Sequence, residues 1–498
     1  MIPWRAILRL LPARTRADEY QLLPDNTAAL QGSPRRRRPF SLTHVCCAFS
    51  LRRLCLLLAV ILVLLVCGVL LSGIPPSYAD IRAFEAALPQ HNLSLAAQPD
   101  GPRYLRFPDH LWGHGLNNVL QEAILMGYLA HRAGRAYVFE DYTWSHSPLP
   151  YTLYDFALRP AHIPLNAFVA GPLAGGPLPG ADQNDIAKRA VSAAFYSQAC
   201  PRATVHTLSS TGAPNDADGA VLLDWWLARL ADVPARCVEI ESSTQPVFDF
   251  SLFGSSRLLS LLPGLASSPV LAAFSWSPLV HSAVARNFAL LRAPDPAALY
   301  PFPSLPSSSP TFPPVTSSPP PTLTSTLGLH LRRGDYSRHC PRLALWGATY
   351  LGANQHPALP DRFDAPANAS AAERTAHYMQ HCYPDAEAIA RRLGAARAAW
   401  AAAHPEAEPL SRVYILTNGW GWFVKGVRAE LMKDGWAEVR GSADMLLDGA
   451  QREVGMAVDM RVGEGVAVFV GNGFSSLTSN IVMLRMARGL DPASNRFL

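Results

Sequence analysis

Apolar runs of strand length alternate with longer helical segments over the C-terminal part of the chain. The pattern predicts strands at residues 326–331, 412–416 and 466–470, and helices at 383–403, 423–433, 450–462 and 475–488. Strands separated by helices of this length are typical of parallel βαβ units. The N-terminal part opens in the same way, with a one-sided apolar helix at 117–132, a capping Gly134 and a strand at 136–140. We therefore expect an α/β fold of two Rossmann-like lobes with a cleft between them.

A proline- and serine-rich stretch at residues 301–325 separates these two parts. Such a composition cannot pack a core and predicts an extended, disordered linker. The expected domains are therefore an N-terminal lobe at 101–300 on the acceptor side and a C-terminal lobe at 326–498 on the donor side. A short stem is expected at 75–100.

Residues 54–74 carry no charge and, as a helix, are long enough to cross a bilayer. The polar, arginine-containing residues 1–53 precede them, and no small-residue cleavage site follows, which argues against a cleaved signal peptide. Basic residues on the N-terminal flank place that side in the cytosol. The sequence thus predicts a single-pass type II protein of the Golgi or endoplasmic reticulum membrane, with a basic cytosolic tail and a lumenal catalytic domain.

The composition narrows the function classes. Hydrophobic residues make up 49% of the 498 residues, which is enough to bury a substantial core and excludes a disordered protein. The net charge is +5, and many of the arginines lie in the first 53 residues. Without a basic face elsewhere, a nucleic-acid partner is not expected.

Four cysteines follow the expected anchor: Cys200, Cys237, Cys340 and Cys382. In an oxidising compartment they predict two disulfides, for which three pairings are possible. Proximity in sequence favours Cys200 with Cys237 and Cys340 with Cys382, and free buried thiols are the alternative. Two sequons, at Asn92 and Asn368, predict a lumenal glycoprotein.

The strand expected at 326–331 leads into the run His330-Leu331-Arg332-Arg333-Gly334-Asp335. Because side chains alternate along a strand, His330 and Arg332 share one face and point into the crevice where parallel sheets bind ligands. Arginine suits a diphosphate because its planar group donates two hydrogen bonds and keeps its charge. The structural alternative is a turn closed by a salt bridge between Arg333 and Asp335.

Two other segments join a glycine-bearing turn to a helix start. Residues 471–478 place Ser475 and Ser476 where unpaired helix amides form an anion site, although plain helix capping is the alternative. Residues 112–118 place His114, Asn117 and Asn118 at a helix start, where the asparagines can cap the helix or bind sugar hydroxyls. The default interpretation of this second segment is a structural turn.

Together the three segments, in this order, resemble the GDP-fucose-dependent protein O-fucosyltransferases and their core and nodulation relatives. The shared patterns are Gly-x-Gly-Leu-Asn-Asn, His-x-Arg-x-Gly-Asp and Gly-Asn-x-x-Ser-Ser-x-Thr, and the overlap covers about residues 102–488. More specifically, the chain looks like the fungal, basidiomycete-type branch of these proteins. The resemblance implies a GT-B fold, a GDP-fucose donor, inversion at the sugar carbon, and no metal ion or other cofactor.

The resemblance also implies roles for single residues. Arg332 would hold the β-phosphate and stabilise the leaving GDP, and Asn117 would face the sugar. The remaining substrate-binding set is Asn118, His330, Asp335, Asp459 beside the guanine edge, and Ser475, Ser476 and Leu477 beside phosphate and fucose. The base is left open, because relatives carry glutamate or arginine where this chain has His114. We expect His114 to accept the acceptor proton, with Glu122 as the fallback.

Three alternatives stay open. A metal-dependent transferase would need an Asp-x-Asp motif, and Asp216-Ala217-Asp218 fits those letters without a preceding apolar strand. A membrane-anchored binding protein could keep the fold and lack catalysis. GDP-mannose could replace GDP-fucose, and the acceptor, a protein Ser/Thr or a glycan, is not determined by the sequence.

Overall fold

The computed structural model describes residues 51–72, 75–108, 115–146, 148–154, 157–179, 183–241, 247–248, 250–291, 323–366 and 368–498. The chain divides into two compact units. The first is Met1–Ile74 with Leu153–Leu158, and the second is Pro75–Thr152 with Arg159–Leu498. Residues 1–50, 109–114 and 292–322 lie outside the described residues. Most of the expected cytosolic tail, the His114 position and most of the expected linker therefore fall there.

The first unit contains helix α2 (Leu51–Ser72), which coincides with the expected membrane anchor at residues 54–74. Among the helices in the described part of the chain, however, none is at once long enough and apolar enough to cross a membrane. The expected transmembrane helix is therefore not found among the described residues.

The second unit contains two five-stranded sheets whose strands all pair in parallel. The N-terminal sheet has the order β8-β2-β1-β10-β9, with β1 (Tyr104–Arg106), β2 (Ala136–Phe139), β8 (Val191–Ser192), β9 (Val205–Leu208) and β10 (Cys237–Ile240). The C-terminal sheet has the order β14-β13-β12-β15-β16, with β12 (Leu323–Leu331), β13 (Arg412–Thr417), β14 (Glu438–Gly441), β15 (Val466–Gly471) and β16 (Asn495–Phe497). The expected α/β organisation with parallel sheets is confirmed.

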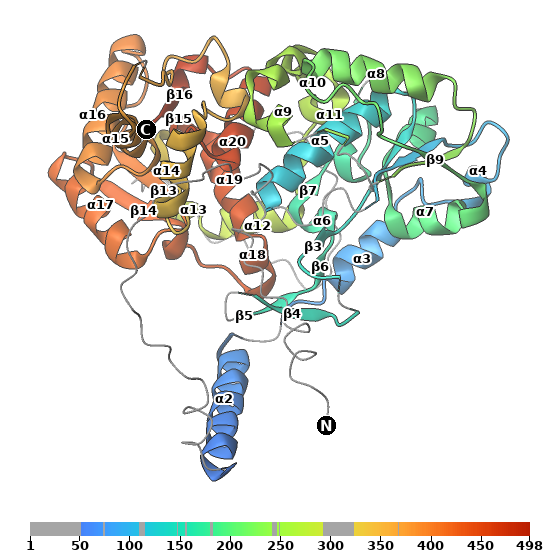
Figure 1. The fold of residues 1–498 in the computed structure, drawn as a ribbon, viewed down its shortest axis with the longest axis horizontal. Helices are drawn as coiled ribbons and strands as arrows, with labels where there is room; N and C mark the ends of the chain where they lie inside the picture. The colour runs from blue at the N-terminus through green and yellow to red at the C-terminus, as the bar shows by residue number, and fades with distance from the viewer. Residues whose placement is uncertain are drawn as a thin grey trace, which may run out of the picture. The chain divides into compact units, whose positions relative to one another are not determined.

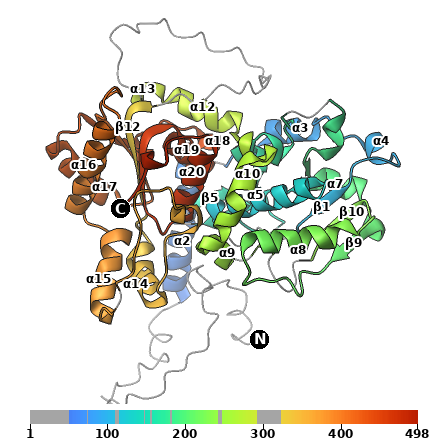
Figure 2. The ribbon, with the colours of Figure 1, turned by 90° about the horizontal axis from the view of Figure 1, so that it is seen from above.

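Helices cover both faces of each sheet, as Figures 1 and 2 show. The N-terminal half contains α3 (Ala79–Ala86), α4 (Leu93–Ala96), α5 (Leu116–Arg132), α6 (Leu165–Phe168), α7 (Ala193–Ala199), α8 (Gly219–Ala231), α9 (Phe250–Gly254), α10 (Leu262–Ser267), α11 (Pro269–Ala272), α12 (Pro278–Arg286) and α13 (Phe288–Leu291). The C-terminal half contains α14 (Tyr336–Trp346), α15 (Ala371–Cys382), α16 (Ala386–Ala403), α17 (Gly421–Lys433), α18 (Gly449–Glu453), α19 (Gly455–Gly465) and α20 (Ser476–Ala487). Short two-stranded pairs join β3 (Tyr142–Thr143) to β6 (His162–Ile163), β4 (Tyr151–Tyr154) to β5 (Ala157–Pro160), and β7 (Val169–Ala170) to β11 (Ser275–Trp276).

The alternation of side chains along β12 divides the core of the C-terminal half. Leu327, Leu329 and Leu331 pack in one apolar cluster with α16 and α17. On the opposite face, α19 and α20 contribute to a second cluster, which also contains side chains of α5 and of one face of the N-terminal sheet. A third, smaller cluster lies between the N-terminal sheet and α7. The two sheets therefore share one of the three cores.

Three boundaries differ from the sequence expectation. Strand β12 begins at Leu323 rather than at 326, because its first residues pair with the start of β15. Residues 75–100, expected as a stem, include α3 and α4, and Ile81 and Ala96 are buried against the body. The helix expected at 450–462 is two helices, α18 and α19, because the chain leaves helical geometry at Val454.

Both predicted disulfides are present. Cys200 bonds to Cys237 and joins the end of α7 to β10, and Cys340 bonds to Cys382 and joins α14 to the end of α15. The sequon residues Asn92 and Asn368 are both exposed. The side chain of Asn92 caps α4 by accepting hydrogen bonds from the amides of Ser94 and Leu95.

Candidate active site

The carboxyl end of β12 carries Arg332, as the alternation rule requires, on the same side as His330. Its guanidinium donates from Nε and Nη2 to the two carboxylate oxygens of Asp335, at 3.1 and 3.3 Å, and the side chain keeps 35% of its surface exposed. The expected salt bridge of this turn is therefore made by Arg332 and not by Arg333. Gly334 allows the turn because its φ of 45° lies in the left-handed region.

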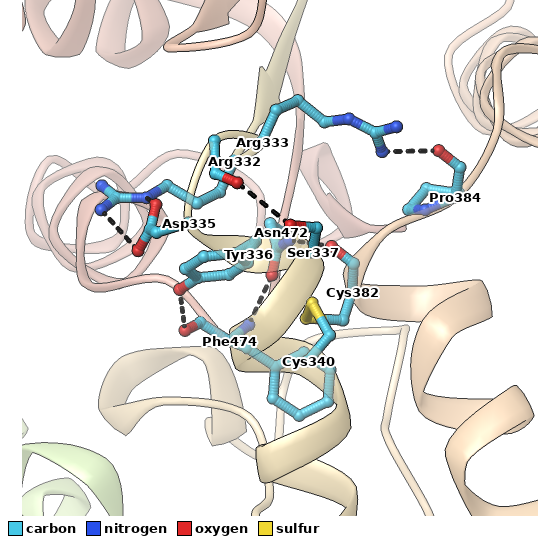
Figure 3. Close-up of a disulfide and its surroundings, with 11 residues drawn as sticks. Arg332, Arg333, Asp335, Tyr336, Ser337, Cys340, Cys382, Pro384, Asn472 and Phe474 are labelled. Atoms are coloured by element: carbon cyan, nitrogen blue, oxygen red, sulfur yellow. Dashed lines mark hydrogen bonds and ion pairs between the residues drawn. A yellow bond between two sulfur atoms is a disulfide. The ribbon is translucent and has the colours of Figure 1, made fainter. Parts of the chain in front are cut away.

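Arg333 points to the opposite side of the sheet. Its guanidinium lies between the rings of Tyr383 and Phe423, at 3.5 and 3.6 Å from their centroids. It also donates to the carbonyl of Pro384, a bond drawn in Figure 3, at 2.8 Å. Burial lowers the pKa of Arg333. The buried contacts on both sides of its plane make Arg333 a structural residue, and Arg332 is the arginine that a ligand can reach.

His330 is buried, and its Nδ1 lies 2.8 Å from Thr478 Oγ1. Burial, and secondly the charge of Arg332, lowers the pKa of His330 to about 3. The imidazole is therefore neutral and cannot add positive charge to a phosphate site. It joins β12 to α20, so the geometry gives His330 a supporting role beside Arg332.

The turn between β15 and α20 brings the second expected element beside the first, because β12 and β15 are neighbours in the sheet. Ser475 occupies the N-cap of α20, but its hydroxyl makes no capping hydrogen bond. The helical bonds begin with Ser479 N to Ser475 O, so the amides of Ser476, Leu477 and Thr478 precede them. Plain capping by Ser475, the alternative interpretation, is not what the structure contains.

Gly473 in this turn has a packing role. A Cβ built on Gly473 would lie 2.3 Å from the ring of Tyr350, so only glycine lets the turn pass that ring. Ser475 is buried, Ser476 is half-buried and Leu477 is 7% exposed. Backbone amides and the hydroxyls of Ser475 and Ser476 therefore lie close together at this turn.

Helix α5 of the N-terminal half contacts α20 directly. Asn480 Nδ2 donates to the carbonyl of Asn117 at 2.9 Å, and Asn117 Nδ2 donates to Met456 Sδ at 3.0 Å. Asn118, the next residue, is half-buried. The side chain of Asn117 is therefore engaged with the C-terminal half, and the structure brings the first and third sequence segments together at α5 and α20.

Of the two candidate bases, His114 lies outside the described residues and Glu122 lies inside α5. Glu122 is 5% exposed, and within the described part of the chain its Oε2 has no hydrogen-bond partner. Burial raises its pKa to about 8. At a pH of about 6.5 only about 3% of such a carboxyl is ionised, so Glu122 holds its proton more readily than it accepts one.

Asp459, expected beside the guanine edge, accepts hydrogen bonds from Tyr414 at 2.8 Å and from Ser442 at 2.7 Å. Burial raises the pKa of Asp459 to about 6, although both hydrogen bonds act in the opposite direction. Each carboxylate oxygen holds a second lone pair, so a base edge can still be accepted. Tyr414 lies in β13 and Ser442 follows β14, which places Asp459 on the β13 side of Arg332.

The Asp-x-Asp letters at 216–218 have a local explanation. Asp218 caps α8 by accepting a hydrogen bond from the amide of Ala220 at 3.1 Å. Across the described ranges, no group of three or more His, Cys, Asp or Glu side chains is placed to hold a metal ion. A cavity of about 320 Å³ lies elsewhere, between Thr324, Trp400, Val466 and Asp491. Thr324 and Val466 stand at the amino ends of β12 and β15, away from Arg332.

Sequence reasoning missed two side chains that join these elements. Tyr336 donates from its hydroxyl to the carbonyl of Phe474 at 2.8 Å, and Asn480 links α20 to Asn117. Tyr336 directly follows the Gly-Asp turn, and this position is the sequence feature that could have pointed to it. Asn480 stands one helical turn after Ser476 on α20, and nothing in its sequence surroundings distinguishes it.

Comparison with known proteins gives fold-level similarity to fucosyltransferase structures. No family model matches the chain, and no curated protein matches it. POFUT1 in complex with GDP-fucose (crystal form I) is 12% identical, with a TM-score of 0.43 over 81% of this chain and 99% of that one. POFUT1 in complex with GDP, in a high-resolution data set, is 12% identical, with a TM-score of 0.39 over 78% and 95%. A mutant of Arabidopsis thaliana FUT1 in complex with GDP is 12% identical, with a TM-score of 0.32 over 82% and 78%. Similarity at this level does not assign the chain to a family.

Proposed function

We propose that this protein is a glycosyltransferase that moves fucose from GDP-fucose to a hydroxyl acceptor, a protein Ser/Thr or a glycan, on a GT-B fold. The observation that carries the proposal is the position of Arg332 and the start of α20 at the carboxyl ends of two neighbouring parallel strands. Ligands of parallel α/β sheets bind at that edge. A guanidinium after one strand and, after the next, amides without a partner among the described residues would form complementary contacts for a diphosphate.

Arg332 would exchange its ion pair with Asp335 for contacts with the diphosphate of the sugar donor. When the diphosphate enters, the guanidinium leaves Asp335 and donates to the β-phosphate, while the amides of Ser476 and Leu477 hold the neighbouring oxygens. Most of the activation barrier comes from the separation of charge as GDP leaves the sugar. A cation held at the phosphate therefore contributes most to lowering that barrier. The hydroxyls of Ser475 and Ser476 and the side chains of Asn117 and Asn118 would orient the sugar.

We propose an inverting reaction without a metal ion. In such a reaction the acceptor hydroxyl attacks the sugar carbon on the face opposite GDP and loses its proton to a base. His114 suits this step better than Glu122, because burial keeps Glu122 protonated at mildly acidic pH. Arg332 and the helix amides supply the positive charge that a cation provides in metal-dependent transferases. Sensitivity to a chelator would overturn this part of the proposal.

The two disulfides support an oxidising compartment, and we propose the lumen of the Golgi or endoplasmic reticulum. Glycosylation at Asn92 and Asn368 would agree with that location. Mass spectrometry of the protein isolated from its natural host tests the location. Reduced cysteines at the four disulfide positions would argue against a lumenal location.

Calorimetry of the purified protein against GDP, GDP-fucose, GDP-mannose and UDP tests the donor. We expect GDP and GDP-fucose to bind, UDP to fail, and Arg332→Ala to lower GDP affinity and reduce turnover by about 10²- to 10³-fold. Release of GDP from GDP-fucose identifies an enzyme, whereas tight binding without release identifies a non-catalytic binding protein. Preferential binding of GDP-mannose would show that GDP-mannose, and not GDP-fucose, is the donor. Absence of GDP binding would refute the proposal.

A further inference from the structure

Tyr336, the first residue of α14, contacts both halves of the candidate diphosphate site. Its ring lies under the guanidinium of Arg332, with 5.4 Å from Arg332 Cζ to the ring centroid. Its hydroxyl donates to the carbonyl of Phe474 (Figure 3), and the distance between the two oxygens is 2.8 Å. The side chain is 7% exposed, so both contacts are held in a packed environment.

Phe474 immediately precedes the N-cap of α20. The Ser475 hydroxyl makes no capping bond, so the start of this helix is not fixed by its own capping side chain. Two other contacts fix the turn: Asn472 Oδ1, within the turn, accepts from the Phe474 amide at 3.0 Å, and Tyr336 of α14 donates to the Phe474 carbonyl. The backbone of Phe474, which leads into the start of α20, is therefore held at both its amide and its carbonyl.

The Cys340–Cys382 disulfide adds a second connection from the same helix. Cys340 lies one turn after Tyr336 on α14, and the carbonyl of its partner Cys382 accepts a hydrogen bond from Asn472 Nδ2 at 2.7 Å. Helix α14 thus holds the turn at two points, at Asn472 through the disulfide and at Phe474 through the Tyr336 hydroxyl (Figure 3). Arg332 lies between β12 and α14 and donates to Asp335, the N-cap residue of α14, so its position is coupled to the turn.

We propose that Tyr336 is a positioning residue that sets the distance between the Arg332 guanidinium and the amides at the start of α20. The inference rests on the proposed diphosphate site. Two sets of donors can hold one diphosphate only if their separation is kept within a fraction of an ångström. The hydroxyl of Tyr336 supplies that restraint on the α20 side, and its ring supplies it on the Arg332 side.

Three variants separate these contributions. Tyr336→Phe keeps the ring and removes the hydrogen bond to Phe474, and Tyr336→Leu removes both contacts. Tyr378→Phe is the matched control: Tyr378 is buried, its hydroxyl donates to the carbonyl of Ala348 at 2.7 Å, and its ring stacks on Phe474. The control therefore removes the same kind of bond near the same residue without releasing the turn.

The measurement is the affinity of the full-length protein for GDP and for guanosine, by calorimetry and competition, with thermal stability recorded in parallel. We expect Tyr336→Phe to weaken GDP binding by about 3- to 10-fold, the loss of one hydrogen bond, and to leave guanosine affinity within about 2-fold. Tyr336→Leu should weaken GDP binding by a further 2- to 5-fold. Tyr378→Phe should lower stability like Tyr336→Phe while leaving GDP affinity unchanged.

A purely structural role would reduce stability without changing the ratio of the two affinities. Equal GDP affinity of wild type and Tyr336→Phe, or an equal loss of affinity for GDP and guanosine, would therefore overturn the inference about Tyr336. Either result would leave the proposed function intact. The Phe variant decides the matter even if Tyr336→Leu fails to fold. If the wild-type protein binds no GDP, both the proposed function and the inference about Tyr336 fail. This result is distinguishable from a failure of the inference alone, in which the wild-type protein binds GDP.

Discussion

Replacing Glu122 with glutamine should remove a large pH dependence from the stability of this protein. Glu122 is buried in α5, and burial raises its pKa from 4.5 to about 8. Between these values the unfolded chain has released the proton and the folded chain retains it. The folded state therefore binds more protons, and its stability falls as pH rises from 4.5 towards 8.

The size of the effect follows from the shift. Each pH unit above 4.5 costs about 1.4 kcal/mol, so at pH 7 the wild-type protein has lost about 3 kcal/mol, and at pH 5 less than about 1 kcal/mol. Glutamine has nearly the same shape and does not ionise. Any packing or hydrogen-bonding cost of glutamine is the same at every pH, so the change between pH 5 and pH 7 isolates the ionisation.

Urea unfolding at 25 °C with the disulfides intact, at pH 5, 6, 7 and 8, provides the assay. We expect wild type to lose about 2–3 kcal/mol more than Glu122→Gln between pH 5 and pH 7. Glu387→Gln, on the exposed surface of α16, is the control and should keep the wild-type slope. Parallel slopes for wild type and Glu122→Gln would show that Glu122 is ionised in the folded protein, and would refute the reasoning.

Three further outcomes are expected. GDP affinity should fall as pH drops through about 6, because protonated Asp459 no longer accepts a hydrogen bond from the guanine base. If GDP affinity depends on pH in the same way in wild type and in Asp459→Asn, Asp459 does not have this role. Replacing Cys340 and Cys382 with serine should lower the free energy of unfolding by about 4 kcal/mol for a loop of 42 residues, and an unchanged urea midpoint would argue against the bond. Trp276→Phe should cost about 2–3 kcal/mol, because Trp276 Nε1 donates to the fully buried Glu464 at 2.8 Å, and thermal unfolding measures it.

Local patterns predicted the sheets and the position of Arg332 because these depend on short-range rules. The alternation of side chains along β12 placed His330 and Arg332 on one face, and the structure agrees. Both disulfides have the pairing that proximity in sequence favoured among the three possible ones. The burial of Glu122 could not be assigned in the same way, because it depends on which elements cover α5.

Other features depend on tertiary contacts that no local pattern encodes. Helix α14 contains Pro341, which normally argues against a helix, yet it is stabilised by the disulfide and by packing against α15. The choice of Arg332 over Arg333 as partner of Asp335 is decided by the rings of Tyr383 and Phe423, which hold Arg333 on the other face. The role of Tyr336 depends on Phe474, more than a hundred residues away in sequence.

The apolar cluster that contains side chains of both sheets limits how the second unit can move. Leu105 and Ile124 of the N-terminal half lie in the same cluster as Leu416 and Ile481 of the C-terminal half. Opening the halves like a hinge would bring these side chains into water, at about 25 cal/mol for each Å² exposed. Substrates should therefore enter through rearrangement of turns and side chains such as Arg332. Heating should melt the two sheets together, because they share this cluster.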